Sequence, residues 1–282
     1  MRIQKYLRLV VFPHTVFALP FALIGMLTAA GGMPSWRVLA LVLVCMVCAR
    51  SSAMAFNRIV DCPFDAINPR TARRPLPAGE LDVRGVAFFV MINSVLFIAA
   101  TALLSRLALL LSPAALALIF FYSFTKRFTW LSHLVLGACL AIAPIGAWIA
   151  VTGTIGLPAL VLSGAVALWV SGFDILYSLQ DMEFDREHGL YSVPARFGLA
   201  GSLRISRALH AGCIVLLGVF GLAAGLTAVY YAGLAAMALL LSRQHFLVRK
   251  GDLSRMGTAF FTVNGWVSMG MLAAVALDLF LR

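Results

Sequence analysis

Charged residues are scarce in this sequence. Only 12% of its 282 residues are Asp, Glu, Lys or Arg, and just 11 are acidic, whereas a typical soluble protein carries about 25% charged residues. Hydrophobic residues make up 62%, so a soluble globular enzyme is excluded. They recur in continuous runs of about 15 to 25 residues, the length that crosses a bilayer as a helix. Because the runs do not alternate with polar residues, they predict transmembrane helices rather than a β-barrel.

Cysteine is also sparse. Four of the five cysteines lie inside apolar runs, which argues against a disulfide framework. Cys45 and Cys48 form a C-x-x-C pair without a second ligand pair, and we interpret both as packing residues. The five histidines show no metal-ligand spacing. Low-complexity segments, linkers and a separate soluble domain are absent from the sequence, so residues 1–282 are predicted to form one transmembrane domain.

About nine membrane spans are predicted from the apolar runs and the charges between them. They cover residues 13–31, 38–60, 85–104, 107–124, 131–151, 157–178, 204–225, 227–241 and 258–280. The first 32 residues imitate a signal peptide. However, Pro13, His14 and Pro20 interrupt the apolar core, so we predict a retained first helix. Two longer connections, at about 61–84 and 179–203, are predicted to be cytoplasmic loops that cap one face.

Basic residues are distributed unevenly between the predicted loops. With the N-terminus inside the cell, the cytoplasmic segments hold 18 of the 22 Lys and Arg residues, and Arg50 lies within the second span. This split predicts an N-in, C-out orientation by the positive-inside rule. The same rule accounts for the net charge of +11, so nucleic-acid binding is not predicted.

Polar side chains recur on one face at the ends of two predicted helices. Asn57, Asp61 and Asp65 are four residues apart at the end of the second span. At the end of the sixth span four residues follow at i, i+3, i+7 and i+11: Asp174, Tyr177, Asp181 and Asp185. Two acidic groups at one membrane depth would repel each other unless a cation lay between them. Mg²⁺ prefers oxygen ligands and is commonly completed by substrate phosphates, so the pattern predicts a magnesium and phosphate site.

Basic residues accompany both acidic groups. Arg70 follows the first, and Lys126 and Arg127 end the fourth span, so all three are candidates to contact phosphate oxygens. Arg50 lies about two turns from Asn57 on the same helical face, where a charge is costly. We interpret Arg50 as a cation for an anionic group of a substrate, with a structural partner for an acid such as Asp174 as the alternative.

The motifs resemble those of the UbiA superfamily of intramembrane aromatic prenyltransferases. Asn57 to Asp65 is similar to its first aspartate motif, Asp174 to Asp185 to its second, and Tyr122-x-x-x-Lys126-Arg127 to its Y-x-x-x-K element. The resemblance covers nearly the whole chain. It implies an all-α bundle of about nine transmembrane helices with a central cavity, in a prokaryotic inner membrane, and an active site that faces the cytoplasm. It implies no obligate protein partner.

The resemblance also implies the reaction. A polyprenyl group would pass from polyprenyl diphosphate to the ring of an aromatic acid, either 4-hydroxybenzoate or 1,4-dihydroxy-6-naphthoate, in ubiquinone or menaquinone biosynthesis. Mg²⁺ would be held by Asn57, Asp61, Asp65, Asp181 and Asp185. The diphosphate would be contacted by Arg70, Tyr122, Lys126 and Arg127. Arg50 would face the acceptor, and Asp174 and Tyr177 would orient the metal shell or steady the allylic cation.

Two positions depart from the family pattern. Pro63 is expected to kink or end the second helix near Ile59, which would move Asp65 into the loop. Arg58 stands where the 4-hydroxybenzoate branch usually has Asp. Alternative functions are another UbiA branch, of haem O or chlorophyll type, and a secondary transporter with intramembrane carboxylates. The D-x-x-D-G-x-x-A-R motif of CDP-alcohol phosphotransferases is absent from the sequence.

Overall fold

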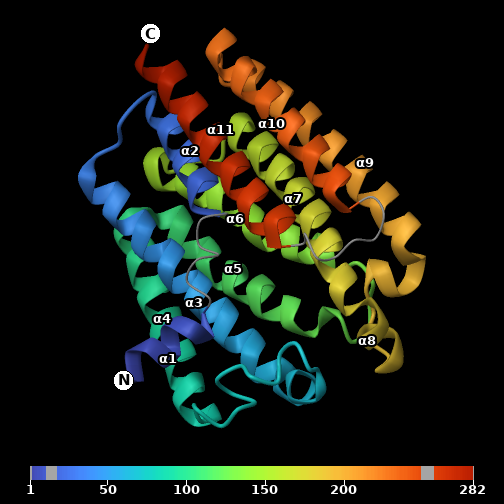
Figure 1. The fold of residues 1–282 in the computed structure, drawn as a ribbon. Coiled ribbons are helices and arrows are strands. Elements are labelled where there is room, and N and C mark those ends of the chain that lie inside the picture. Colours follow the sequence, from blue (N-terminus) through green and yellow to red (C-terminus); the bar gives the residue numbers. More distant parts are fainter. Residues whose placement is uncertain (1, 11–17, 249–256, 282) are drawn as a thin grey trace. The chain divides into compact units, whose positions relative to one another are not determined.

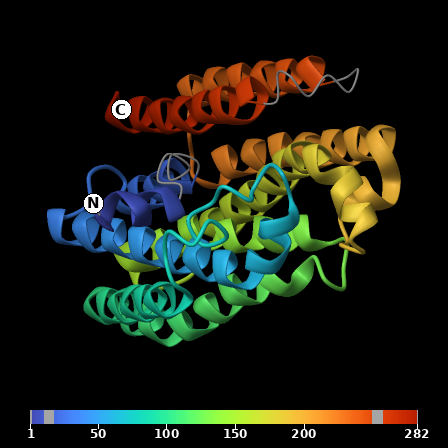
Figure 2. The same ribbon diagram turned by 60° about the horizontal axis from the view of Figure 1, so that its bottom comes forward.

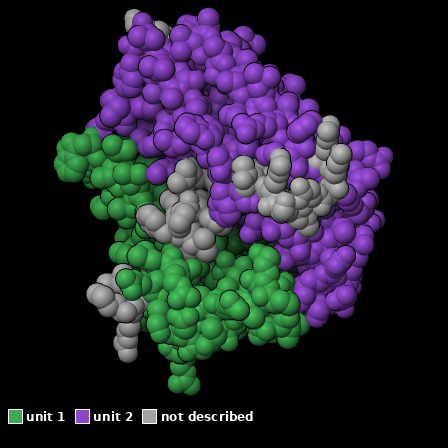
Figure 3. Space-filling view, in the orientation of Figure 1, with its two compact units in different colours: residues 1–15, 36–124 green, residues 16–35, 125–282 purple. Residues whose placement is uncertain are grey.

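The computed structural model describes residues 2–10, 18–248 and 257–281, and these residues form helices and no strand (Figure 1). The chain divides into two compact units (Figure 3). Unit 1 comprises residues 1–15 and 36–124, and unit 2 comprises residues 16–35 and 125–282.

The prediction of an all-helical membrane protein is confirmed, because 7 helices of the described residues are long and apolar enough to cross a membrane. Five of them are single helices: α3 (Trp36–Ile67), α4 (Val83–Leu104), α5 (Arg106–Thr125), α6 (Ser132–Thr152) and α9 (Val193–Ala223). A sixth comprises α7 (Leu157–Ser178), η2 (Leu179–Asp181) and α8 (Met182–Glu187). The seventh is the segment Phe260–Phe280, which belongs to η4 (Thr258–Thr262) and α11 (Val263–Phe280). The two further predicted spans correspond to α2 (Ala18–Ala30) and α10 (Ala228–Val248). Residues 13–17 of the first predicted span lie outside the described residues.

Helix starts near the acidic segments are fixed by local sequence. The carboxylate of Asp82 accepts a hydrogen bond from Gly85 N at 2.8 Å and caps α4. Ser192 Oγ accepts one from Ala195 N at 3.2 Å and caps α9. Pro194 lies in the first turn of α9, where its missing N–H leaves no helix bond unmade.

Helix α3 continues through Pro63 to Ile67, so the predicted end of the second helix near Ile59, with Asp65 in the loop, is wrong. The alternative that Pro63 kinks the helix stays a prediction. Proline removes one helix hydrogen bond, and here only about one further turn of helix follows it. That turn is held from outside, since Thr71 Oγ1 donates to the carbonyl oxygen of Asp65 at 3.1 Å. Asp65 is therefore a helical residue.

The acidic end of the sixth predicted span is not one continuous α-helix. Helix α7 ends at Ser178, the turn η2 is a 3₁₀-helix, and α8 begins at Met182. A 3₁₀ turn rotates each residue by about 120°, against about 100° in an α-helix. The four polar side chains predicted here therefore lie on three successive elements rather than on one helical face. In the first predicted loop, α3 occupies residues 61–67 and turns follow at residues 68–81.

Unit 1 is built on the packing of α3 against α4. Ser52 Oγ of α3 donates to the carbonyl oxygen of Val90 at 3.4 Å. Helix α1 (Arg2–Leu9) is joined to the turn segment after α3, because Arg8 donates to both carboxylate oxygens of Glu80 at 3.1 Å. An apolar cluster lies between these elements and contains Leu9, Ala55, Leu76, Val86 and Val90.

Unit 2 is built around α7, which packs between α6 and α9 (Figures 1 and 2). Trp169 in the middle of α7 is fully buried. Helices α6 and α7 approach closely at Gly137, where a Cβ atom would collide with the carbonyl oxygen of Ala167 and with Ser171 Oγ. The absence of a side chain at Gly137 thus sets the separation of the two helices.

A residue of α11 caps the N-terminus of α10. The carboxylate of Asp278 accepts hydrogen bonds from Thr227 N at 2.9 Å and from Tyr230 N at 3.3 Å, and the Thr227 hydroxyl donates to it as well. These backbone donors belong to the first turn of α10, which has no intrahelical acceptors for them. Asp278 of α11 thus caps α10, the preceding helix of unit 2.

Candidate functional site

The predicted site residues fall into two groups, one in each unit. The first group lies in unit 1 and contains Arg50, Asn57, Asp61, Asp65, Arg70 and Tyr122. The second group lies in unit 2 and contains Lys126, Arg127, Asp174, Tyr177, Asp181 and Asp185. Contacts within each unit fix the geometry of its own group. That both groups bind one ligand is part of the proposed function.

Asn57 and Asp61 are brought together on α3. Asn57 Nδ2 donates to Asp61 Oδ2 at 2.8 Å across one helical turn, and both side chains are partly buried. The predicted common face of these two residues is confirmed. The amide orients the carboxylate, and each side chain keeps an oxygen that can bind a cation.

Asp65 is held by two arginines of unit 1. Arg74 Nη1 donates to its two carboxylate oxygens at 2.6 and 2.7 Å, and Arg58 Nη1 lies 4.0 Å from Oδ2. Asp65 and Arg58 are 6% and 8% exposed, so these charges would be costly without one another. The sequence did not predict Arg74 or Arg58 as partners of Asp65. The only signal was the unusual arginine beside Asn57.

The remaining residues of the first group differ in exposure. Arg50 is partly buried, and its Nε atom is buried with no hydrogen-bond partner among the described residues. Arg70 is exposed in the turn after α3, and its backbone N–H donates to Asn68 Oδ1 at 2.9 Å. Tyr122 is partly buried in α5 and lies within electrostatic range of Arg58. Arg50 thus offers a buried donor to an anionic group.

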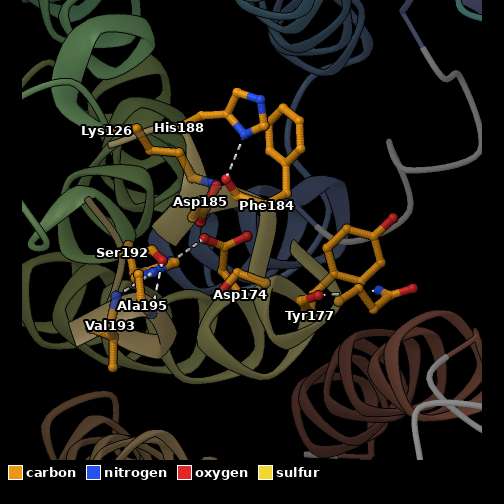
Figure 4. A network of polar contacts seen from close by, with 12 residues as sticks. Lys126, Asp174, Tyr177, Phe184, Asp185, His188, Ser192, Val193 and Ala195 are labelled. Carbon is orange, nitrogen blue, oxygen red and sulfur yellow. Dashed lines mark hydrogen bonds and ion pairs between the residues drawn. The ribbon is translucent and has the colours of Figure 1, made fainter. Parts of the chain in front are cut away.

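Lys126 and Asp185 form the centre of the second group (Figure 4). Lys126 Nζ lies 3.5 Å from Asp185 Oδ2, and the Asp185 side chain is 2% exposed. Asp185 Oδ2 is buried and has no hydrogen-bond partner among the described residues, so its contact with Lys126 is an ion pair alone. The backbone also joins the two segments, because Tyr191 N donates to the carbonyl oxygen of Lys126 at 2.7 Å. Arg127 is exposed.

Asp174 is bonded to a histidine that the sequence analysis did not single out. His133 Nδ1 lies 2.6 Å from Asp174 Oδ2. The ring of Tyr177 packs on Phe260, with 4.2 Å between the ring centroids. Asp181 is buried in η2. A histidine in the first turn of an apolar helix carries no motif, so only the three-dimensional structure identifies His133.

Both groups combine carboxylates with cationic side chains. Among the described residues of either unit, no three His, Cys, Asp or Glu side chains form a complete metal cage. Mg²⁺ is commonly bound by one or two carboxylates together with substrate phosphates. The donor set of oxygens, lysine and arginine therefore suits a phosphate-bearing ligand with a hard divalent cation.

Comparison with known proteins agrees with this chemistry. The UbiA prenyltransferase family matches residues 18–266. The chain is 32% identical to a 4-hydroxybenzoate octaprenyltransferase of Tolumonas auensis over 88% of this chain and 86% of that protein. It is also 32% identical to the enzyme of that name from Nitrosospira multiformis, over 92% of this chain and 88% of that protein.

Solved structures share the fold. A UbiA homolog from Aeropyrum pernix K1, solved in the apo form, matches with a TM-score of 0.85 and 36% identity over 94% of this chain and 98% of that one. A UbiA homolog from Archaeoglobus fulgidus bound to GPP and Mg²⁺ matches with a TM-score of 0.72 at 19% identity over 98% and 99% of the two chains, which bears on the fold alone. By its sequence over most of its length and by its fold, the chain belongs to the UbiA prenyltransferase family.

Proposed function

We propose that this integral membrane prenyltransferase transfers a polyprenyl group from polyprenyl diphosphate to the ring of 4-hydroxybenzoate, or of 1,4-dihydroxy-6-naphthoate, in respiratory quinone biosynthesis. The C–O bond to the diphosphate breaks with its electron pair on the leaving group, a C–C bond forms to the ring, and the ring carbon loses its proton to solvent. The observation that carries the proposal is the buried Asp185 carboxylate, which is ion-paired with Lys126 through Oδ2 and makes no hydrogen bond through that oxygen among the described residues.

The residues present fit Mg²⁺. In the proposal it is held by Asn57, Asp61, Asp65, Asp181 and Asp185. The buried Asp185 carboxylate, with no hydrogen bond to Oδ2 among the described residues, and the side-chain oxygens of the Asn57 and Asp61 pair support this assignment. When bound, the ion supplies positive charge against the diphosphate oxygens.

The basic residues neutralise the rest of the diphosphate. Lys126 carries its charge to a buried carboxylate at 3.5 Å, and a phosphate oxygen at the same place would receive it equally well. Arg127 and Arg70 are exposed and supply further positive charge to the diphosphate, and Tyr122 contacts it through its hydroxyl. Asp174 and Tyr177 face the developing allylic cation or orient the metal shell, and the apolar helices exclude water.

The proposal includes a topology. Nine spans, counting α2 and α10, place the N-terminus in the cytoplasm and the C-terminus outside, and the capping segments at about 61–84 and 179–203 lie on the cytoplasmic side. In this topology both site groups lie toward the cytoplasmic side of a prokaryotic inner membrane. The uneven distribution of basic residues supports it.

A competition assay tests the proposed function. The protein in detergent receives Mg²⁺, a labelled polyprenyl diphosphate, and both acceptors together, and the product is identified by mass. We expect prenylated 4-hydroxybenzoate, because relatives at 32% identity carry that name. Prenylated naphthoate would instead place the enzyme in menaquinone synthesis. An intact diphosphate without either product would refute prenyl transfer to these acids.

Arg50→Ala is expected to raise the KM for the aromatic acid by about 10- to 100-fold, the worth of a hydrogen bond to a charged group. The KM for the diphosphate should stay within about twofold, because the buried Nε of Arg50 is assigned to the acceptor carboxylate. Steady-state kinetics with each substrate varied in turn measures both values. Arg106→Ala, an exposed arginine of the same unit, is the control, and an unchanged acceptor KM in Arg50→Ala would return Arg50 to a structural role.

Asp65→Asn is expected to lower both activity and stability. The substitution leaves Arg58 and Arg74 without their shared carboxylate, at a cost of about 2 kcal/mol or more after allowance for the partial exposure of Arg74. Asp61→Asn retains an oxygen that can accept the hydrogen bond from Asn57 Nδ2, so it should lose activity with a smaller fall of the thermal midpoint. Thermal unfolding in detergent compares the two, and equal midpoints would contradict the structural role of Asp65.

A further inference from the structure

The geometry points to His133 as a positioning residue that holds the Asp174 carboxylate in place for the prenyl transfer proposed above, on which this inference rests. His133 is 1% exposed and lies in the first turn of α6. Its Nδ1 lies 2.6 Å from Asp174 Oδ2, and its Nε2 lies 3.3 Å from Val193 N. Both ring nitrogens thus have partners, and the partners come from two other helices, α7 and α9.

The partners decide the tautomer of the ring. A backbone N–H can only donate, so the Val193 N–H requires an unprotonated Nε2 in His133. A neutral imidazole with a bare Nε2 carries its proton on Nδ1, which then donates to Asp174 Oδ2. A second proton on Nε2 would face the Val193 N–H and break that bond. His133 is therefore a neutral donor to an ionised Asp174.

The ring has little freedom to turn away. Ser171 Oγ donates to the backbone carbonyl oxygen of His133 at 3.1 Å, and Gly137 permits the close approach of α6 to α7. The carboxylate of Asp174 is 18% exposed. Among the described residues, the Asp174 carboxylate is hydrogen-bonded to His133 through Oδ2 alone, so Oδ1 keeps a fixed direction toward a further partner. Side chains locked in this manner are what a preorganised site requires.

His133 also connects Asp174 to the segment that holds Asp185. Tyr191 lies two residues before Val193, the first residue of α9, and the Tyr191 N–H donates to the carbonyl oxygen of Lys126 at 2.7 Å. Figure 4 shows Lys126, Asp185, Asp174 and Val193 in one network. His133 thereby links Asp174 to the segment that bonds to Lys126, the ion-pair partner of Asp185.

Two substitutions separate the two bonds of His133. The Asn side chain places an N–H donor where Nδ1 stands, so His133→Asn retains the bond to Asp174 and loses the one to Val193. The Gln side chain places an acceptor near the position of Nε2, so His133→Gln retains the bond to Val193 and loses the one to Asp174. His188→Asn, an exposed histidine on the same side of unit 2, is the matched control.

We expect His133→Gln to lower kcat by about 10- to 100-fold, the loss of one hydrogen bond to a charged group, with both KM values within about twofold. His133→Asn should recover kcat to within about threefold of the wild type. Adding His133→Gln to Asp174→Asn should cause no further loss, because the histidine acts through the acid. Equal losses in the Asn and Gln variants, or additive losses in the double variant, would overturn the inference.

A second readout keeps the inference testable if the Gln variant does not fold. Protein labelled with ¹⁵N in its histidines should show one signal of a neutral Nδ1–H imidazole that is absent from His133→Asn. If the signal lost in His133→Asn were instead that of a neutral Nε2–H imidazole or of an imidazolium, the assignment would be overturned. Wild-type protein without prenyl transfer would refute the proposed function instead, while the tautomer measurement would still stand.

Discussion

Asp181→Ala is expected to abolish Mg²⁺-dependent prenyl transfer while the protein stays folded. Asp181 is buried in the single 3₁₀ turn between α7 and α8, where the proposed metal and diphosphate bind. Removing one preorganised group that stabilises a developing charge typically costs about 10²- to 10³-fold in kcat, and a lost metal ligand should cost at least that. Turnover is measured across a Mg²⁺ titration that extends to high concentration.

Glu183→Ala is the matched control for Asp181→Ala. Glu183 is exposed and lies two residues further along the same segment. Its substitution therefore removes an acid without changing the proposed site. Both variants should stay folded with a thermal midpoint close to that of the wild type, because neither introduces a buried charge or polar group that would need a hydrogen-bond partner. Wild-type turnover in Asp181→Ala would remove Asp181 from the metal site.

Gly137→Ala is expected to be the most destabilising small substitution in unit 2. The added Cβ would collide with the carbonyl oxygen of Ala167 and with Ser171 Oγ, and a backbone atom cannot move aside as a flexible side chain can. Overpacking typically costs about 1–3 kcal/mol and occasionally more, so we expect a loss at the upper end of that range. The thermal midpoint in detergent should fall by several degrees.

Gly146→Ala tests whether the site of the substitution matters. Gly146 lies on the same helix, α6, and a Cβ atom there has open space around it. Replacing a helical glycine by alanine at such a place should stabilise the helix by up to about 1 kcal/mol. If Gly137→Ala and Gly146→Ala shifted the midpoint alike, the close approach of α6 to α7 would not be set by Gly137. Because Ser171 also holds His133, Gly137→Ala should additionally lower kcat.

Local periodicity was sufficient for the features that depend on one helix. Apolar runs of membrane length predicted the spans, and the four-residue spacing of Asn57 and Asp61 predicted a common helical face, on which the structure shows a 2.8 Å hydrogen bond. Such features follow from the geometry of the α-helix alone. They require no knowledge of what packs against it.

The features that the sequence did not predict depend on contacts from elsewhere in the chain. Pro63 was expected to end α3, but Thr71 holds the turn that follows. His133 bonds to residues 41 and 60 positions away, and no local pattern encodes such a pairing. Arg74 lies nine positions beyond Asp65, outside any helical register. Each case reflects a bond made across a turn or between helices.

The cap on α10 has a consequence for how the chain is made. The first turn of α10 begins at Ala228, yet its acceptor, Asp278, is synthesised 51 residues after Thr227. During membrane insertion α10 must therefore leave the translocon with bare N–H groups in its first turn. These N–H groups gain the Asp278 acceptor only when α11 packs beside α10. In a chain whose synthesis stopped before residue 278, α10 would therefore lack its cap.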